Sequence, residues 1–276
     1  MMILSGPSRR EHKIGAMGKG LSYPEGLIDR LEVFWGVGFL SPGGREEVRE
    51  ILRNVRIQNK SVLDIGCGIA GPAIVIARDL GAKNVVGIDI EPQVIARAAR
   101  NVSEAGLQNR VDLKLVEPGP LPFADASFDI VFSKDALIHI EDKPAFYNEI
   151  VRVLKPDGTF AASDWLASED SGELPEFIDW IEMSPHDFAM QTMAQAEAVM
   201  CEAGFVDVTA RDRNAWYVDL SLIELERMEG PLRERFLEVC EEEAYQQIVK
   251  VRRANAAAAR CGGLRPTHLR GAGPTA

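Results

Sequence analysis

Between residues 61 and 163, short apolar runs alternate with segments that carry a helical pattern. The runs SVLDIG, NVVGID, RVDLKLV, FDIVFS and GTFAAS have the length and composition of buried strands. Helical segments such as PQVIARAARNVSEAG and KPAFYNEIVRVL separate them. Because a strand, a helix and a second strand of one sheet pack as a right-handed crossover, the alternation predicts an α/β fold with a doubly wound, Rossmann-like sheet.

The remaining segments are arranged around this core. We expect residues 1–20 to form a flexible leader, and residues 21–58 to form a helical lid that the glycine-rich WGVGFLSPGG interrupts. Residues 59–165 are the predicted ligand-binding core, and residues 166–203 are an acidic, tryptophan-containing helical insertion after the fifth strand. Residues 204–276 supply two more strands, FVDVTARDR and RPTHLRG, with a long helical section between them. The prediction is therefore a seven-stranded sheet.

Charge and composition exclude several classes of protein. The formal net charge is −11, whereas a nucleic-acid partner would need a basic face. We find no apolar run of the roughly 20 residues that a membrane span needs, and no secretory signal at the N-terminus. The four cysteines and four histidines lack metal-ligand spacing, so we predict no metal. Unpaired cysteines indicate a reducing, cytoplasmic location. The sequence does not decide between a monomer and a homo-oligomer.

The stretch VLDIGCGIAG ends the first predicted strand in a glycine-rich turn. Gly66 and Gly68 allow the backbone to pass close to a ligand. The spacing is D-x-G-x-G, not the G-x-G-x-x-G that opens a helix for a pyrophosphate, and Asp64 would repel a pyrophosphate but attract an amino group. Asp89, which ends the second strand, can accept hydrogen bonds from both hydroxyls of a ribose. A cofactor with a ribose, a positive charge and no phosphate is S-adenosylmethionine (SAM).

VLDIGCG, GIDI and LPFADASFDIVFSKDALIHI together resemble, in this order, the motifs of class I SAM-dependent methyltransferases. The resemblance covers about residues 20–215 and implies SAM as cofactor, with S-adenosylhomocysteine as its product. It implies that the side chains and glycines at the strand ends hold the methionine, ribose and adenine parts. These positions are Asp64, Gly66 and Gly68 for methionine, Asp89 for the ribose, Ile90 and Glu117 for the adenine, with Pro118 and Ser133 in the same site.

Two of these positions depart from the family's usual pattern. Glu117 stands where the family usually has an aspartate that contacts the adenine amino group. Pro118 replaces the alanine that usually follows. The adenine contact is therefore less well defined by the sequence than the ribose contact.

A finer resemblance lies in SYPEGLIDRLEVFWGVGFLSPGG and FSKDALIHI, which are similar to segments of phosphoethanolamine N-methyltransferases. In that family a tyrosine and a histidine form a latch over the bound ligands, and an aspartate lies near the substrate amine. The corresponding residues here are Tyr23, His139 and Asp135. Leu40 and Ser41 fall where that family closes the cofactor site.

The predicted insertion departs from that family. The phosphoethanolamine enzymes bind phosphate with arginine and tyrosines after the fifth strand, but PEFIDWIEMSPHDFAM contains no Arg, Lys or Tyr. Trp165 stands where a tyrosine usually follows the aspartate of the fifth strand. Because an acidic insertion would repel a phosphate, we expect phosphoethanolamine to be a poor acceptor.

Methyl transfer to an amine requires an unprotonated nitrogen, and an amine with a pKa of about 10 must first lose a proton. His139 is the candidate base. Asp135, four residues earlier, can hold the ammonium, or can orient the imidazole if the segment forms one helical turn.

Aromatic side chains are the candidate substrate-binding groups, since their faces attract cations. The candidates are Trp165, Trp180, Trp216 and Tyr217, beside the carboxylates Asp135 and Asp164. Arg211 and Arg213 either bind a substrate carboxylate or flank the edge strand.

The sequence thus predicts a SAM-dependent methyltransferase that acts on a small-molecule amine. S-methylation of a thioether, which needs no base, and C- or O-methylation of a metabolite are alternatives. A SAM-binding protein without catalytic activity is a hypothesis of a different class.

Overall fold

The computed structural model describes residues 23–184 and 188–275. The expected flexible leader, residues 1–20, lies outside these residues. The strands are β1 (Ser61–Ile65), β2 (Asn84–Asp89), β3 (Val111–Leu115), β4 (Phe128–Lys134), β5 (Leu154–Ala167), β6 (Val206–Asp212) and β7 (Leu264–Ala272). They form one seven-stranded sheet in the order β3-β2-β1-β4-β5-β7-β6. The first five strands are parallel, and β7 runs antiparallel between β5 and β6. The predicted doubly wound, Rossmann-like sheet is confirmed.

Several helices begin where the sequence places proline or a capping side chain. The α-helices are α1 (Glu25–Trp35), α2 (Gly44–Ile51), α3 (Gly71–Arg78), α4 (Pro92–Glu104), α5 (Lys143–Val153), α6 (Pro175–Met183), α7 (Met193–Glu202), α8 (Asn214–Glu229), α9 (Arg233–Val239) and α10 (Glu242–Arg260). Short 3-10 turns span Leu137–His139 (η1) and Ser171–Glu173 (η2). Proline at the first turn suits α3, α4, α5 and α6, because its fixed φ matches a helix and its missing N–H has no partner there.

Helices cover both faces of the sheet, and each face has its own core. Apolar residues of α2, α3 and α4 pack on one face, with Val62 and Phe132 of the sheet. On the other face, α5 and α7 cover Leu63, Val131 and Phe160. Alternate residues of β1 and β4 therefore point to opposite cores, as expected for strands buried on both faces.

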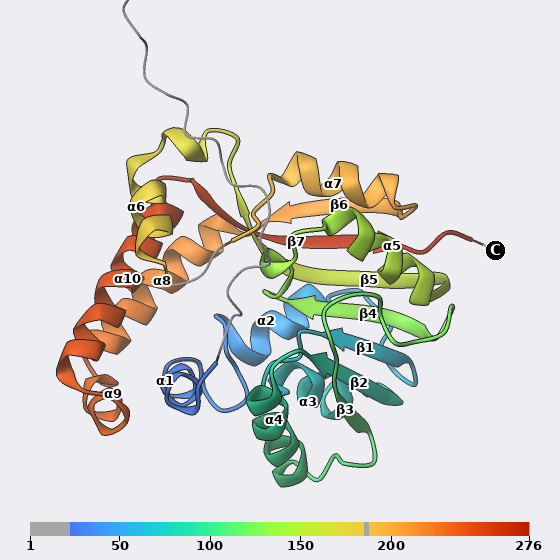
Figure 1. Ribbon diagram of the computed structural model, residues 1–276, viewed down its shortest axis with the longest axis horizontal. Coiled ribbons are helices and arrows are strands. Elements are labelled where there is room, and N and C mark those ends of the chain that lie inside the picture. Colours follow the sequence, from blue (N-terminus) through green and yellow to red (C-terminus); the bar gives the residue numbers. More distant parts are fainter. Residues whose placement is uncertain (1–22, 185–187, 276) are drawn as a thin grey trace, which may run out of the picture.

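Three consecutive helices between β6 and β7, namely α8, α9 and α10, form a lobe beside the sheet, together with α1 and α6 (Figure 1). Phe34 of α1 packs with Phe236 and Tyr245 of the lobe, and Trp180 of α6 packs with Tyr217 of α8. Of the predicted insertion, α6 joins this lobe, whereas α7 lies against α5 and β6 on the sheet. In Figure 1 the strand β4 points toward the lobe, so the carboxyl ends of the parallel strands face it.

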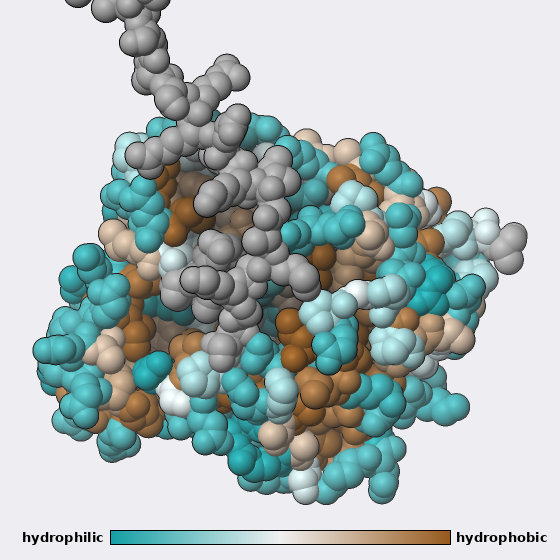
Figure 2. Space-filling model, in the orientation of Figure 1, coloured by the Kyte–Doolittle hydropathy of each residue, from teal (hydrophilic) through white to brown (hydrophobic). Residues whose placement is uncertain are grey.

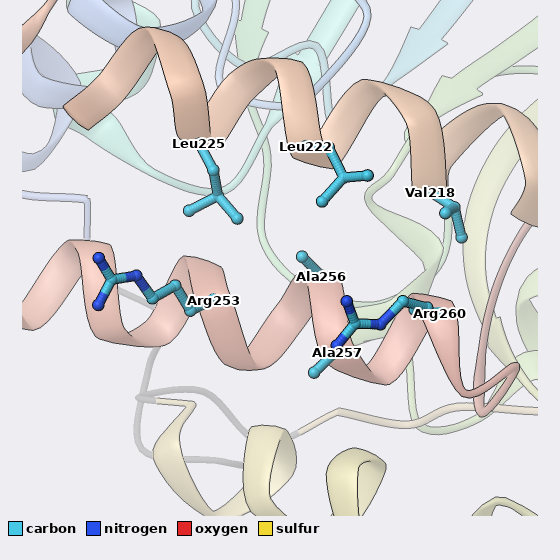
Figure 3. A pocket seen from close by; sticks show the side chains of 7 residues that line it. All are labelled: Val218, Leu222, Leu225, Arg253, Ala256, Ala257 and Arg260. Atoms are coloured by element: carbon cyan, nitrogen blue, oxygen red, sulfur yellow. The ribbon is translucent and has the colours of Figure 1, made fainter. Parts of the chain in front are cut away.

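Between α8 and α10 the lobe carries an apolar groove on its outside (Figure 3). Its lining residues are Val218, Leu222, Leu225, Arg253, Ala256, Ala257 and Arg260. Elsewhere, hydrophilic side chains occupy most of the periphery of the face that Figure 2 shows. None of the helices in the described part of the chain combines the length and the apolar composition needed to cross a bilayer.

The segment between α1 and α2 lies directly on the first helix after the glycine-rich turn. The N–H of Gly71 donates to the carbonyl of Gly38 over 2.8 Å. A Cβ atom on Gly71 would lie 2.1 Å from that carbonyl oxygen. Only glycine permits this approach, which fixes the position of residues 36–43 over the sheet edge.

We expect Gly71→Ala to lower the free energy of unfolding by about 1–3 kcal/mol, because the added methyl group must push residues 36–43 away from α3. Urea denaturation measures this. Gly172→Ala is the matched control, since a Cβ there meets no atom within 4 Å. Equal stabilities for the two variants would contradict the close packing of this segment.

Candidate active site

The turn after β1 is held against the segment that follows β4. Gly66 and Gly68 have φ angles of 67° and 53°, in the left-handed region that favours glycine. A Cβ on Gly66 would lie 2.4 Å from the Cβ of Ala136. The carboxyl ends of β1 and β4 are therefore in contact, at the edge of the sheet where α/β proteins bind ligands.

Asp64 is completely buried at the end of β1. Neither of its carboxylate oxygens has a hydrogen-bond partner among the described residues. Burial, and to a lesser degree the charge of Asp89, raises the pKa of Asp64 to about 8. A buried carboxyl group without a partner is costly, and a cationic ligand group nearby would remove that cost.

Asp89 ends β2 and is held by the backbone on either side. Its two carboxylate oxygens accept hydrogen bonds from the N–H groups of Gly68 (3.0 Å) and Glu91 (3.1 Å). Burial raises the pKa of Asp89, although these backbone hydrogen bonds act in the opposite direction. Because each oxygen has a second lone pair, Asp89 can still accept hydrogen bonds from a ligand.

Exposed apolar side chains follow the ends of β2 and β3. Ile90 is 48% exposed and Leu115 is 50% exposed, and Leu115 pairs with Asp89 in the register of β2 and β3. Glu117 and Pro118 are exposed in the loop after β3. This edge offers an apolar surface beside Asp89, as expected where an adenine packs.

Ser133 differs from the other predicted cofactor residues. Its side chain is fully buried, and its hydroxyl donates to the carbonyl of Ile65 over 2.9 Å. Ser133 thus joins the ends of β1 and β4, and its hydroxyl is already engaged within the sheet.

Tyr23, Leu40 and Ser41 lie over this edge from the N-terminal side. Tyr23 and Leu40 pack with Ile69 and Val94. Burial, with the nearby charges of Asp89 and Glu91, raises the pKa of Tyr23 to about 12. Leu40 lies over the glycine turn, since a Cβ on Gly68 would be 3.4 Å from its Cδ1.

Lys134 connects this covering segment to Asp135. Its Nζ donates to the Oγ of Ser41 (2.7 Å), the carbonyl of Pro42 (2.8 Å) and the carboxylate of Asp135 (2.5 Å). Ser163 also donates to Asp135, over 2.7 Å. Burial alone would raise the pKa of Asp135, but Lys134 and these hydrogen bonds keep it below its ordinary value. Asp135 is therefore an ionised carboxylate in a buried position.

Asp135 lines a small pocket, whose aromatic walls are Trp165, Trp216 and Tyr217. Trp165 and Tyr217 meet edge to face, with ring centroids 4.9 Å apart. Pro42 belongs to the same wall, so the segment that covers the glycine turn also borders this pocket. Three of the four aromatic residues predicted to bind substrate are brought together here.

Trp180, the fourth, is buried behind the pocket in a row of aromatic rings. It stacks on Trp165 (6.4 Å between centroids) and on Phe188 (5.5 Å), and Phe188 lies 6.0 Å from the ring of His139. His139 ends the short turn η1. It is thus linked to the aromatic wall through two rings.

Two details differ from the expectations for this segment. The turn after β4 is not one α-helical turn: Asp135 has a φ of 57°, and a 3-10 turn begins at Leu137. Asp135 accepts hydrogen bonds from Lys134 and Ser163, and the helical turn that would let it orient the imidazole of His139 is absent. Asp164 lies on the opposite face of β5 from Trp165, and its carboxylate accepts the N–H of Ile138. Burial raises the pKa of Asp164 to about 7.

Three residues of the site escaped the sequence analysis. Lys134 precedes Asp135 directly, and its position at the end of β4 was the available signal. Glu47 and His268 form a buried hydrogen bond of 2.5 Å between α2 and β7. They are 221 residues apart, so no spacing pattern could have paired them.

No group of three or more His, Cys, Asp or Glu side chains within residues 23–184 and 188–275 could hold a metal ion. A fold of this strand order, with acidic and glycine residues at the ends of β1 and β2 beside an aromatic pocket, defines a class I methyltransferase.

Comparison with known proteins gives the same class of protein. Residues 57–210 match the family described as "Methyltransferase domain". Phosphoethanolamine N-methyltransferase 1 of Arabidopsis thaliana is 33% identical over 232 residues, which are 83% of this chain and 45% of the relative. Phosphoethanolamine N-methyltransferase of Plasmodium falciparum is 26% identical over 226 residues, 81% of this chain and 82% of the relative.

A solved structure of Haemonchus contortus phosphoethanolamine N-methyltransferase 2, in complex with phosphomonomethylethanolamine and S-adenosylhomocysteine, superimposes with a TM-score of 0.80. It is 25% identical, and the match covers 92% of this chain and 59% of that chain. The chain spans about half the length of the plant relatives it matches. Because the family match extends over more than half of its residues, the chain belongs to this methyltransferase family.

Asp64 makes stability depend on pH. The unfolded chain has an ordinary aspartate with a pKa of about 3.9, so between about pH 4 and pH 8 the folded protein binds one proton more. The free energy of unfolding therefore falls by up to about 1.4 kcal/mol per pH unit as the pH rises across this window, and it levels off above pH 8. In Asp64→Asn this loss is absent.

We expect the ligand-free Asp64→Asn variant to match the wild type near pH 4 and to exceed its stability by a few kcal/mol at pH 8.5. Urea denaturation at both pH values, with wild type and variant side by side, gives the difference. A difference that does not change with pH would show that Asp64 is ionised in the folded protein.

Proposed function

We propose that the protein transfers a methyl group from SAM to the nitrogen of a small-molecule amine. The observation that carries the proposal is the ionised, buried Asp135 in an aromatic pocket that adjoins the glycine turn. The relatives in Arabidopsis thaliana and Plasmodium falciparum, named as N-methyltransferases of an amine, support the same class of acceptor.

The residues at the sheet edge fit SAM. The unpartnered Asp64 suits the cationic amino group of its methionine part, and Asp89 has lone pairs for the ribose hydroxyls. The exposed Ile90 and Leu115 suit the adenine. Tyr23 and Leu40 would cover the bound cofactor. When bound, SAM supplies an electrophilic methyl group on a sulfonium sulfur.

The acceptor pocket suits an amine that becomes or remains a cation. Asp135 attracts the ammonium, and the faces of Trp165 and Trp216 contribute roughly 0.5–2 kcal/mol each. The buried walls hold the acceptor in place and exclude water. His139, four residues after Asp135 but not among the described residues that line this pocket, is the proposed base for the proton that the amine must lose before its nitrogen can react.

We also propose that the enzyme acts in a reducing compartment such as the cytoplasm. Its four cysteines form no disulfide within the described part of the chain. Cys67 lies within the glycine turn, between Gly66 and Gly68, and is buried against Gly87, so its oxidation would disturb the site.

Methyl-labelled SAM and a mixture of small amines and thioethers test the proposal, with products identified by mass spectrometry. A labelled amine is expected. A labelled sulfonium would overturn N-methylation but leave the methyltransferase assignment intact. SAM binding without a labelled product from any amine would contradict the proposal as a whole.

We expect His139→Ala to lower kcat for the methylated amine by about 10²–10⁴-fold at pH 7 and by less at pH 9, because more of the amine is then unprotonated. Initial rates at both pH values measure this. Binding of S-adenosylhomocysteine, followed by calorimetry, should stay within a few-fold of wild type. An unchanged kcat at pH 7 would remove His139 as the base.

A further inference from the structure

We propose that Arg213 binds a carboxylate of the acceptor, so that the substrate is a small zwitterionic amine of the amino-acid kind. This inference rests on the proposed function and specifies its substrate class. It concerns the wall of the pocket that Arg213, α8 and β7 build.

Arg213 lies between β6 and α8 and is held from three sides. Its backbone N–H donates to the carbonyl of Pro266 over 2.7 Å. The guanidinium lies over the ring of Trp216, 4.5 Å from the ring centroid, and donates to Glu47 over 2.9 Å. A guanidinium held by packing and one hydrogen bond loses little conformational freedom when it binds a ligand.

Arg213 also has donors to spare. The guanidinium carries five N–H groups, and the described contacts use one of them. Its Nε is buried without a hydrogen-bond partner among the described residues. An unpaired buried donor is costly, and a bound carboxylate would remove that cost.

The hydrogen bonds of His268 determine the charge of this wall. Arg211 can only donate, so the Nδ1 of His268, 2.9 Å away, is the acceptor. The other ring nitrogen, Nε2, then carries the hydrogen and donates to Glu47. Hydrogen bonds from His268 and Arg213 lower the pKa of Glu47 against the effect of burial, so Glu47 is ionised.

The formal charges around the pocket then sum to zero. Arg213 is balanced by Glu47, and Asp135 is balanced by Lys134 behind it. A neutral site with separated positive and negative groups complements a zwitterion. A phosphomonoester, with a charge of about −1.5 to −2, would bring an excess of negative charge next to Glu47 and Asp135.

The two charges lie on one pocket, which favours the same class. Asp135 and Arg213 both line it, with Trp165 and Trp216 among the residues between. An acceptor with an amine at one end and a carboxylate at the other can meet both charges at once.

Acceptors that differ only in the anionic end test the proposal. We would compare glycine, sarcosine and β-alanine with ethanolamine and phosphoethanolamine, and measure kcat/KM with labelled SAM. At least one of the three carboxylates is expected to exceed ethanolamine and phosphoethanolamine by about 100-fold, the effect of a buried charge pair worth about 2.7 kcal/mol. A preference for phosphoethanolamine or ethanolamine would overturn the assignment while leaving N-methylation intact.

Variants of Arg213 separate recognition from folding. Arg213→Gln, and Arg213→Gln with Glu47→Gln to keep the charge balanced, should lose about 100-fold in kcat/KM for the carboxylate acceptor but less than about 3-fold for ethanolamine. Arg53→Gln is the matched control, an exposed arginine that is paired with Glu50 and lies outside the pocket lining. A parallel loss for both acceptors would show that Arg213 is merely structural. No methylation of any amine, with S-adenosylhomocysteine still bound, would contradict the proposed function itself.

Discussion

The candidate site depends on the buried ammonium group of Lys134. Its three hydrogen bonds join the end of β4, the segment that covers the glycine turn, and Asp135. Removing one partner of a buried ion pair typically costs about 3–5 kcal/mol, because the other charge is left without compensation. Lys134 therefore fixes the relative positions of the cofactor edge and the acceptor pocket.

The same contact explains how a short loop can serve two binding sites. Leu40 lies over Gly68, Ser41 accepts the hydrogen bond from Lys134, and Pro42 borders the acceptor pocket. The close approach of Gly38 to Gly71 holds the beginning of this loop. Methyl transfer needs a donor and an acceptor held in line in a dry site, and a loop anchored at both ends can provide that arrangement.

The sequence was most informative where structure is local. Alternating apolar runs predicted the sheet and its five parallel strands, because each signal lies within a few residues. The segment after β4 was harder to foresee: Asp135 adopts a left-handed conformation and contacts Lys134 and Ser163, so the helical turn that would bring it to the imidazole of His139 does not form. The Glu47–His268 bond joins α2 to β7 and depends on the complete sheet, so no pattern along the chain could indicate it.

The division between cofactor and acceptor follows from the topology. Residues that fit SAM follow β1, β2 and β3, whose parallel arrangement brings their ends to one edge. The acceptor pocket instead draws on β5, β7 and the start of α8, because the antiparallel β7 lies between β5 and β6. A basic residue that the insertion after β5 lacks can thus come from the end of β6, as Arg213 does. Substitutions at β6 and β7 can change the anionic end that is recognised without disturbing the cofactor edge.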